Sequence, residues 1–354
     1  MRKHALAGTL VCVIVVSACG LLPSTLTDGG PKTGPTTTPN PFATATPTAF
    51  EPATPTAGPA ETATPALTPI PTFDASQPWG DFPAPTEPSA IEIRPPAEPI
   101  PFGANVVNIL LLGSDARPYE GGYRTDVMMI ASLDPNKGTA TLVSIPRDLY
   151  VYIPGWRVDR INTAEPRGGL ELAAQTLLYN FGIPIHYYAR MNFNGFKNLV
   201  DTLGGVEVES TGYLYDECGG TWYRFNPDYT YHMNGFTALC YVRMRKHSSD
   251  FDRLRRQQEV ITAIFQKVLT LNGLSRVPEL YRQFNSMVET DIGLQQAIRL
   301  LPLASHLANN RQELRRITID RSMATGWRVP YSGAAVLLPQ WDTIEATLHE
   351  AFGS

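Results

Sequence analysis

The sequence has few of the residues that hold transition metals or build common cofactor sites. It contains 4 cysteines and 6 histidines in 354 residues, with no CxxC or HExxH motif and no histidine cluster, which argues against a zinc centre. It also lacks GxGxxG, a Walker-type phosphate loop and GxSxG, the motifs of dinucleotide, nucleoside triphosphate and serine-hydrolase sites. If the protein is an enzyme, its chemistry rests on carboxylates and arginines.

A long hydrophobic run is also missing. At the N-terminus, "MRKHALAGTLVCVIVVSACG" places a short basic region before an apolar stretch that is too short for a comfortable membrane span. Its end, "VSAC", resembles the lipobox of bacterial lipoprotein signals, in which Cys19 is lipidated and becomes the mature N-terminus. A plain cleaved secretory signal or a marginal membrane anchor fits the same stretch. In each case the chain is exported, and lipidation holds it at the outer face of the cytoplasmic membrane.

Residues 20–104, which follow the signal at 1–19, lack the apolar surface of a folded domain. They hold 20 of the 31 prolines and 8 acidic against 2 basic residues. Such a Pro/Thr-rich segment cannot offset its ordering entropy, which predicts a disordered, partly polyproline-like linker. The remaining residues, 105–354, have a net charge of about zero, which speaks against a protein that coats nucleic acid.

Export determines the expected state of the cysteines. Cys12 leaves with the signal and Cys19 carries lipid, so Cys218 and Cys240 remain. Two cysteines in an oxidising compartment most simply form one disulfide. It closes a loop of about twenty residues and stabilises the fold by roughly 3 kcal/mol on the chain-entropy model.

Three charged motifs border apolar strands at the start of this domain. "VVNILLL" predicts a buried strand that ends in "GSDAR", and "VMMIASL" predicts a strand that begins after "RTD". After the turn "DPNKG", "TATLVSI" predicts a third strand, which forms a hairpin with the second and ends in "PRD". Asp115, Asp126 and Arg147 are therefore expected at one edge of the sheet, where ligand crevices lie in open α/β sheets.

Further along the chain, helical and strand periodicities alternate. Helices are expected at 168–182, 193–205, 253–271 and 339–353, and strands at 186–192, 206–210 and 315–320. This alternation predicts an α/β fold, an α-β-α sandwich around a mixed central sheet. Within the domain, residues 105–262 carry the motifs and residues 263–354 form a more helical C-terminal part.

The segment "YVRMRKHSSDFDRLRRQQ" (241–258) carries more positive charge than its surroundings explain. Alternation in "CYVRMR" predicts a strand with Arg243 and Arg245 on one face. The following helix is expected to be capped by Asp250 or Asp252, with three arginines in its first turn, a place that cations avoid unless an anion binds there. These arginines are Arg253, Arg255 and Arg256. A solvated charge run explains the segment equally well when it is taken alone.

The acids at the sheet edge favour the ligand-binding interpretation. Carboxylates and guanidinium groups together suit a divalent metal and a diphosphate, with the metal bridging Asp115 and Asp126 to phosphate oxygens. The ordered motifs "NILLLGSDAR", "RTDVMMI", "LVSIPRD", "RIN", "LGGVEV" and "YVRMR" with "SDFDRLRRQQ" resemble the LytR-CpsA-Psr family of bacterial cell-envelope enzymes. The resemblance covers about residues 105–262.

This resemblance implies a phosphotransferase that moves a glycopolymer from a polyprenyl diphosphate carrier to a cell-wall hydroxyl, commonly on peptidoglycan. It implies Mg²⁺ (or Mn²⁺) held by Asp115 and Asp126, and catalytic roles for Arg147, Arg245 and Asp126. The residues that it assigns to the diphosphate are Arg147, Arg243, Arg245 and Gln257, with Arg117, Arg124, Arg253 and Arg256 as further contacts. A structural salt bridge explains Arg117 and Arg253 equally well.

The chain departs from the family pattern at two loop positions and in its anchor. Ser248 stands where an acidic residue is frequent, and Asp252 stands where glycine is frequent. Because Ser248 removes one candidate carboxylate, the proton acceptor stays open between Asp126 and Asp250. Members are also usually held by a transmembrane helix rather than by lipid. Apolar stretches at 172–183 and 193–203 fit a lipid tunnel, although such stripes are commonly ordinary core.

Two other functions fit the same residues. A binding or regulatory lipoprotein would sense lipid-linked phosphate without turnover, whereas paired acids favour catalysis. A phosphatase or pyrophosphatase would differ only in using water in place of a sugar hydroxyl. The expected partners are thus a polyprenyl diphosphate-linked glycan, a peptidoglycan acceptor and the membrane, and no nucleic acid.

Overall fold

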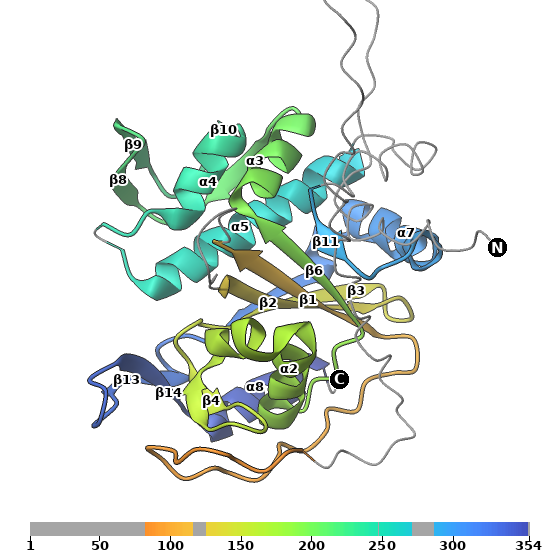
Figure 1. The fold of residues 1–354 in the computed structure, drawn as a ribbon. Coiled ribbons are helices and arrows are strands. Elements are labelled where there is room, and N and C mark those ends of the chain that lie inside the picture. The colour runs from red at the N-terminus through yellow and green to blue at the C-terminus, as the bar shows by residue number, and fades with distance from the viewer. Residues whose placement is uncertain (1–81, 116–124, 247, 271–286, 353–354) are drawn as a thin grey trace, which may run out of the picture. The chain divides into compact units, whose positions relative to one another are not determined.

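The computed structural model describes residues 82–115, 125–246, 248–270 and 287–352 (Figure 1). A mixed six-stranded sheet in the order β11-β6-β1-β2-β3-β12 forms its centre. These strands are β1 (Val107–Ser114), β2 (Thr125–Asp134), β3 (Thr139–Ser144), β6 (Tyr187–Asn192), β11 (Glu289–Thr290) and β12 (Leu314–Thr318). Strand β1 is parallel to β6 and antiparallel to β2, and β2 is antiparallel to β3, which confirms the predicted hairpin. Strand β12 adds parallel to β3.

The central strands are apolar along their length because both faces of the sheet are covered. In β1, Ile109, Leu110 and Leu112 are all at most 3% exposed, although neighbouring residues of a strand point to opposite faces. The continuous run that predicted a buried strand therefore has its physical cause in two helical layers.

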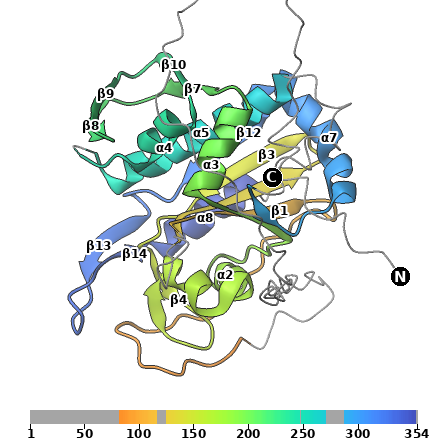
Figure 2. The same cartoon turned by 45° about the horizontal axis from the view of Figure 1, so that its top comes forward.

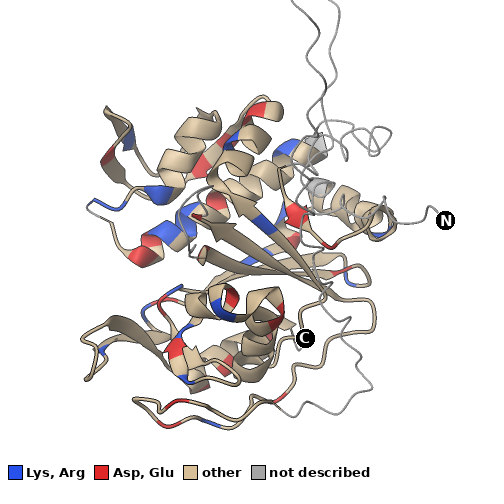
Figure 3. Ribbon diagram, viewed as in Figure 1, with Lys and Arg blue, Asp and Glu red and all other residues tan. Residues whose placement is uncertain are grey.

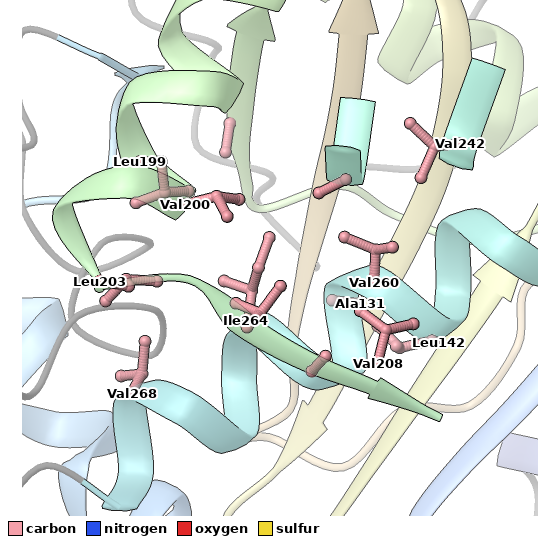
Figure 4. Packing of buried hydrophobic residues seen from close by; sticks show 14 of the residues in the cluster. Ala131, Leu142, Leu199, Val200, Leu203, Val208, Val242, Val260, Ile264 and Val268 are labelled. Atoms are coloured by element: carbon pink, nitrogen blue, oxygen red, sulfur yellow. The ribbon is translucent and has the colours of Figure 1, made fainter. Parts of the chain in front are cut away.

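Helices cover each face of the sheet (Figures 1 and 2). On one side lie α3 (Phe193–Thr202), α4 (Gly235–Arg243), α5 (Asp250–Thr270) and α7 (Leu294–Asn309), and on the other lie α2 (Ala164–Phe181) and α8 (Trp341–Phe352). In Figure 4, Val260 and Ile264 of α5 lie in one apolar cluster with Ala131 and Leu142 of the sheet. The predicted α-β-α sandwich is thus confirmed.

Shorter elements complete the described chain. Four two-stranded sheets pair β4 (Tyr150–Tyr152) with β5 (Val158–Arg160), β7 (Val206–Ser210) with β10 (Tyr229–Met233), β8 (Leu214–Cys218) with β9 (Thr221–Phe225), and β13 (Ala324–Arg328) with β14 (Ala335–Pro339). Two 3₁₀ helices, Ile161–Thr163 and Arg311–Glu313, lie between larger elements.

The folded domain begins earlier than the sequence predicted. Residues 82–104, assigned to the disordered linker, lie on the domain as an extended segment. The Ala97 amide donates to Tyr179 O at 2.8 Å, and the Ile100 amide donates to Gly182 O at 3.0 Å. Ala97 and Ile100 are buried, so the segment has apolar anchors that its proline-rich composition conceals. The signal, Cys19 and the rest of the linker lie outside the described residues.

The predicted strand in "CYVRMR" is wrong. Helix α4 covers this segment and ends at Arg243, while Arg245 lies in the following loop. The Asn234 side chain caps the helix by accepting from the Thr237 amide at 2.9 Å. Ala238, Tyr241 and Val242 are buried at helical spacing, and the short alternating run concealed this longer period.

The start of the next helix also differs from expectation. Ser249, rather than Asp250 or Asp252, is the cap: its hydroxyl accepts from the Asp252 amide at 3.1 Å, and the Asp252 carboxylate accepts from the Ser249 amide at 2.9 Å. The first turn of α5 thus carries the two acids, which the helix dipole favours. The arginines from Arg253 onward follow that turn, so the expected conflict with the dipole is absent.

Candidate active site

A β-bulge sets the position of Asp126. Gly113 pairs with Val127 and Ser114 pairs with Thr125, which leaves Asp126 as the extra residue of β2. The backbones approach closely here, because a Cβ on Gly113 would lie 2.9 Å from the Val127 side chain. The bulge turns the Asp126 carboxylate toward the loop after β3.

Arg147 meets Asp126 at this edge, as the strand order predicted. Its Nη1 lies 2.5 Å from Asp126 Oδ1, and its Nε lies 3.3 Å from Asp148 Oδ2. Burial alone would lower the pKa of the Arg147 guanidinium, but the hydrogen bond to Asp126 and the charge of Asp148 outweigh it and raise the pKa. The "RIN" motif supports this loop, since the Asn162 amide donates to Arg147 O at 3.3 Å.

Asp250 joins two further arginines beside this pair. Arg245 donates to its carboxylate, and Arg253 Nη1 lies 3.3 Å from Asp250 Oδ1. Burial tends to raise the pKa of Asp250, but the Arg245 hydrogen bond and the charges of Arg253 and Arg147 outweigh burial and lower it. Figure 3 shows basic and acidic residues interspersed along the start of α5.

Arg253 is the most enclosed cation of the group. Its side chain is 8% exposed, and its Nε has no hydrogen-bond partner in the described part of the chain. Burial lowers its pKa, Asp250 opposes that effect, and the neighbouring charges of Arg147 and Arg245 add to it. Arg147, Arg245 and Arg253 thus gather around Asp126 and Asp250, and Arg147 also contacts Asp148. We call Arg147, Arg245, Arg253, Asp126 and Asp250 the arginine cluster, and its guanidinium groups offer charge-assisted hydrogen bonds to a phosphate ligand.

No motif in the sequence indicated a role for Asp216, which positions the backbone of Arg245. This buried carboxylate of β8 accepts from the backbone amides of Arg245 at 2.9 Å and Lys246 at 2.8 Å. Burial raises the pKa of Asp216, but the backbone hydrogen bonds from Lys246, Glu217 and Arg245 outweigh it and lower the pKa. Next to it, Cys218 and Cys240 are joined by a disulfide that ties β8 to α4.

Other predicted site residues lie in different surroundings. The Arg243 guanidinium lies 4.3 Å from the centre of the Phe193 ring, and Arg243 and Arg245 share no strand face. Arg256 is buried and donates to Tyr241 O at 2.9 Å and Met244 O at 2.5 Å, so it holds the loop between α4 and α5.

Gln257 is 5% exposed, and its Oε1 has no hydrogen-bond partner among the described residues. It follows Arg253 by one helical turn and so lies on the same face of α5. Arg117 and Arg124 lie outside the described residues. Arg255 contacts Thr211 O at 3.3 Å instead, away from the cluster.

Asp115 and Asp126 are the two carboxylates expected to hold a divalent metal. Asp115 directly follows β1, beside the bulge that carries Asp126. Among the described residues no group of three or more His, Cys, Asp or Glu side chains forms a metal cage. Mg²⁺ is commonly held by one or two carboxylates together with substrate phosphates and water. The donor set therefore fits Mg²⁺ in the presence of a phosphate ligand.

A match to the sequence model of a protein family establishes which family the chain belongs to. The model of the LytR_cpsA_psr family matches residues 95–348, which include part of the segment assigned to the linker. The chain belongs to this family. The fold agrees, since the family's "Crystal structure of B. subtilis TagV" superposes with a TM-score of 0.60 at 25% identity and covers 70% of this chain and 97% of that chain.

Relatives in the family carry named activities. A polyisoprenyl-teichoic acid–peptidoglycan teichoic acid transferase TagU of Oceanobacillus iheyensis is 34% identical over 220 residues, which are 58% of this chain and 65% of that protein. TagU of Bacillus mycoides is 33% identical over 211 residues, 59% of this chain and 67% of that protein. The structure "TagT bound to LI-WTA" has a TM-score of 0.55 and 26% identity, and covers 71% of this chain and 92% of that chain. The chain thus spans about two thirds of the length of the TagU relatives.

Proposed function

We propose that the protein is a cell-envelope phosphotransferase that moves a glycopolymer, of the teichoic acid kind, from a polyprenyl diphosphate to a hydroxyl of peptidoglycan. The observation that carries the proposal is the arginine cluster, in which three guanidinium groups gather with Asp126 and Asp250 at the end of the sheet. The TagU names and the TagT structure with its ligand support the substrate class.

The reaction exchanges one phosphorus–oxygen bond for another. The acceptor hydroxyl attacks the sugar-proximal phosphorus, the bond to the polyprenyl phosphate breaks, and polyprenyl phosphate leaves. Negative charge develops on the phosphate oxygens, and Arg147 and Arg245 stabilise it from fixed positions. Arg253 adds positive charge from the helix side, and the Gln257 amide offers a polar contact to the same diphosphate.

The hydroxyl proton passes to a carboxylate of the cluster, for which Asp126 and Asp250 are the candidates. We also propose that Asp115 and Asp126 hold Mg²⁺, which supplies charge neutralisation at the diphosphate when it is bound. We expect an Asp126→Asn variant to bind Mg²⁺ more weakly in the presence of a diphosphate, measured by calorimetry. An unchanged affinity for Mg²⁺ would exclude Asp126 as a metal ligand.

The proposed location is the outer face of the cytoplasmic membrane, reached by export and held by lipid on Cys19. No helix among the described residues combines the length and apolar character needed to span a membrane.

The experiment that tests the proposal incubates the purified protein with a polyprenyl diphosphate-linked glycan, with and without peptidoglycan fragments. A transferase attaches labelled glycan to the fragments and releases polyprenyl phosphate only when they are present. Equal release of phosphate or glycan in both reactions would indicate a phosphatase or pyrophosphatase. Tight binding without any conversion would indicate a sensor of lipid-linked phosphate.

A further inference from the structure

The hairpin formed by β8 and β9 carries two stacked aromatic side chains on its outer face. The rings of Tyr215 and Trp222 have their centres 4.9 Å apart and are inclined by 26°. Tyr215 is 37% exposed and Trp222 is 52% exposed. In Figures 1 and 2 this hairpin lies at the outer side of α4. We call the pair the aromatic platform.

Folding of the hairpin does not account for the platform. Leu214 and Asp216 on β8 and Phe225 on β9 point inward and are buried, and Leu214 and Phe225 join the main apolar cluster. Tyr215 and Trp222 occupy the alternate, outward positions, where a large part of each ring stays exposed. Leaving two large adjacent rings in water is unfavourable, and such a patch commonly marks a binding surface.

Two cations border the platform. The Arg224 guanidinium lies 5.3 Å from the Tyr215 ring centre, and the Lys246 ammonium lies 5.2 Å from the Trp222 ring centre. Lys246 directly follows Arg245 of the arginine cluster. The platform is therefore connected through Lys246 to the loop that carries Arg245.

The platform is fixed relative to that site. Asp216, between Tyr215 and the disulfide residue Cys218, holds the Arg245 and Lys246 amides with its carboxylate. The disulfide joins the end of β8 to α4. A ligand on such a surface loses less free energy to ordering of the protein than one on a mobile loop.

The charges beside the platform nearly balance. On the outer face of the hairpin the carboxylate Glu217 and the cation Arg224 accompany the two rings, and the cation Lys246 lies beside Trp222. The aromatic rings, rather than a patch of one charge sign, therefore dominate this surface. They suit an uncharged sugar strand, because the C–H face of a pyranose ring packs on an aromatic ring while its hydroxyl and amide groups stay hydrated.

We propose that Tyr215 and Trp222 bind a sugar ring of the acceptor, a neutral β-1,4-linked N-acetyl amino sugar strand, and direct its hydroxyl toward the arginine cluster. This inference rests on the proposed function for its choice of acceptor, but binding alone tests it. The side chain that carries most of the contact is Trp222, which has the larger exposed ring.

The test measures binding to peptidoglycan that has been freed of teichoic acid, and to a soluble β-1,4-linked N-acetylglucosamine oligosaccharide. Trp222→Ala is expected to weaken binding of both about tenfold, as loss of a central aromatic contact commonly does. Trp222→Phe keeps an aromatic face and should retain most of the affinity. Tyr229→Ala is the matched control, because Tyr229 is 62% exposed on β10 of the neighbouring two-stranded sheet and takes no part in the stack.

Kinetics and a second polymer separate the outcomes. With transfer active, Trp222→Ala should raise KM for peptidoglycan fragments about tenfold and change KM for the lipid-linked donor by less than about twofold. Equal losses in Trp222→Ala and Tyr229→Ala, or absence of wild-type binding, would overturn the inference. Weakened binding of soluble teichoic acid instead would also overturn it, by assigning the platform to the donor. Binding of peptidoglycan that depends on Trp222, without any transfer, would support the platform as a binding site and contradict the proposed function.

Discussion

Asp250 links two guanidinium groups of the arginine cluster. It is the carboxylate that Arg245 contacts, and it lies 3.3 Å from Arg253. Without such an anion, the guanidinium groups of Arg147, Arg245 and Arg253 would repel one another across a half-buried space. A bound diphosphate would offer the same arginines more negative charge. It would free Asp250 from these contacts and bring its pKa back toward the usual range, which suits a proton acceptor.

Asp216 gives a pH-dependent prediction at the residue scale. Because its carboxyl pKa is lowered in the folded state, its charged form stabilises the fold above the usual value of 3.8, and this contribution is lost as the pH falls through the lower, folded-state pKa. Asp216→Asn should reduce the free energy of unfolding by about 1 to 2 kcal/mol at pH 7, since charge-assisted hydrogen bonds are weakened. Urea unfolding measured from pH 7 downward should show the difference shrinking below pH 3.8.

Glu217→Gln supplies the control for this prediction. Glu217 is the next residue of β8 and points to solvent, so its change should stay within about 0.5 kcal/mol at every pH. A stability difference between Asp216→Asn and wild type that stays constant down to strongly acidic pH would contradict the electrostatic explanation.

Contacts between residues were predictable where strand order imposes them. Asp126 and Arg147 stand at two ends of one hairpin, so apolar runs and a turn suffice to bring them together. Asp216 reaches the Arg245 amide across 29 residues, and no charge pattern or spacing in the sequence encodes that contact. Arg256 shows the converse, because a helix-surface arginine in the sequence is a buried donor to backbone carbonyls in the fold.

At the scale of elements, the disulfide between Cys218 and Cys240 connects the β8–β9 hairpin to α4. Replacing both cysteines by serine should lower the free energy of unfolding by roughly 3 kcal/mol, mainly because the unfolded chain gains freedom. It should also reduce transfer, since the hairpin sets the position of the Arg245 backbone through Asp216. Thermal melting measures the loss of stability. Intact mass under non-reducing conditions should show the wild-type protein lighter by two hydrogens than its reduced form. Free alkylation of both thiols in the native protein would refute the disulfide.

The strands were easier to predict than the helix before the arginine loop. Strands β1 to β3 are buried on both faces, so their composition alone distinguishes them. In "CYVRMR" an alternating run of five or six residues fits both the two-residue period of a strand and the 3.6-residue period of a helix. The helix is decided by its start, where the Asn234 side chain caps the chain and Gly235 lies so close to Lys197 O that a Cβ would be 2.2 Å away.

At the scale of the whole molecule, residues 82–104 belong to the folded domain. Arg94 pairs with Glu345 of the terminal helix at 2.5 Å, and the Phe82 ring packs against Tyr179. Proline excludes regular strand pairing here but permits burial of side chains along an extended chain. Composition therefore placed the linker boundary too late, because it reports missing periodicity rather than missing contacts.

The anchor prediction belongs to the same scale. If Cys19 carries lipid, Cys19→Ala should release the protein from the membrane or leave the signal uncleaved, because one acylated residue supplies the attachment. Membrane fractionation with intact mass distinguishes the two results. Unchanged anchoring together with unchanged mass would exclude lipidation and leave residues 5–18 as an uncleaved anchor.

The central claim is that the arginine cluster catalyses glycopolymer transfer. The measurement that tests it most directly is the rate at which alanine variants transfer labelled glycan to peptidoglycan fragments. Arg147→Ala and Arg245→Ala should each lower the rate by about two to three powers of ten, because each removes a charge-assisted contact from a preorganised site. Arg255→Ala should change the rate little, since Arg255 contacts Thr211, Asp252 and Glu259 instead of the cluster. Thermal melting of each variant separates lost chemistry from lost folding. Equal, small effects at Arg245 and Arg255 would contradict the account and leave the cluster as a solvated surface.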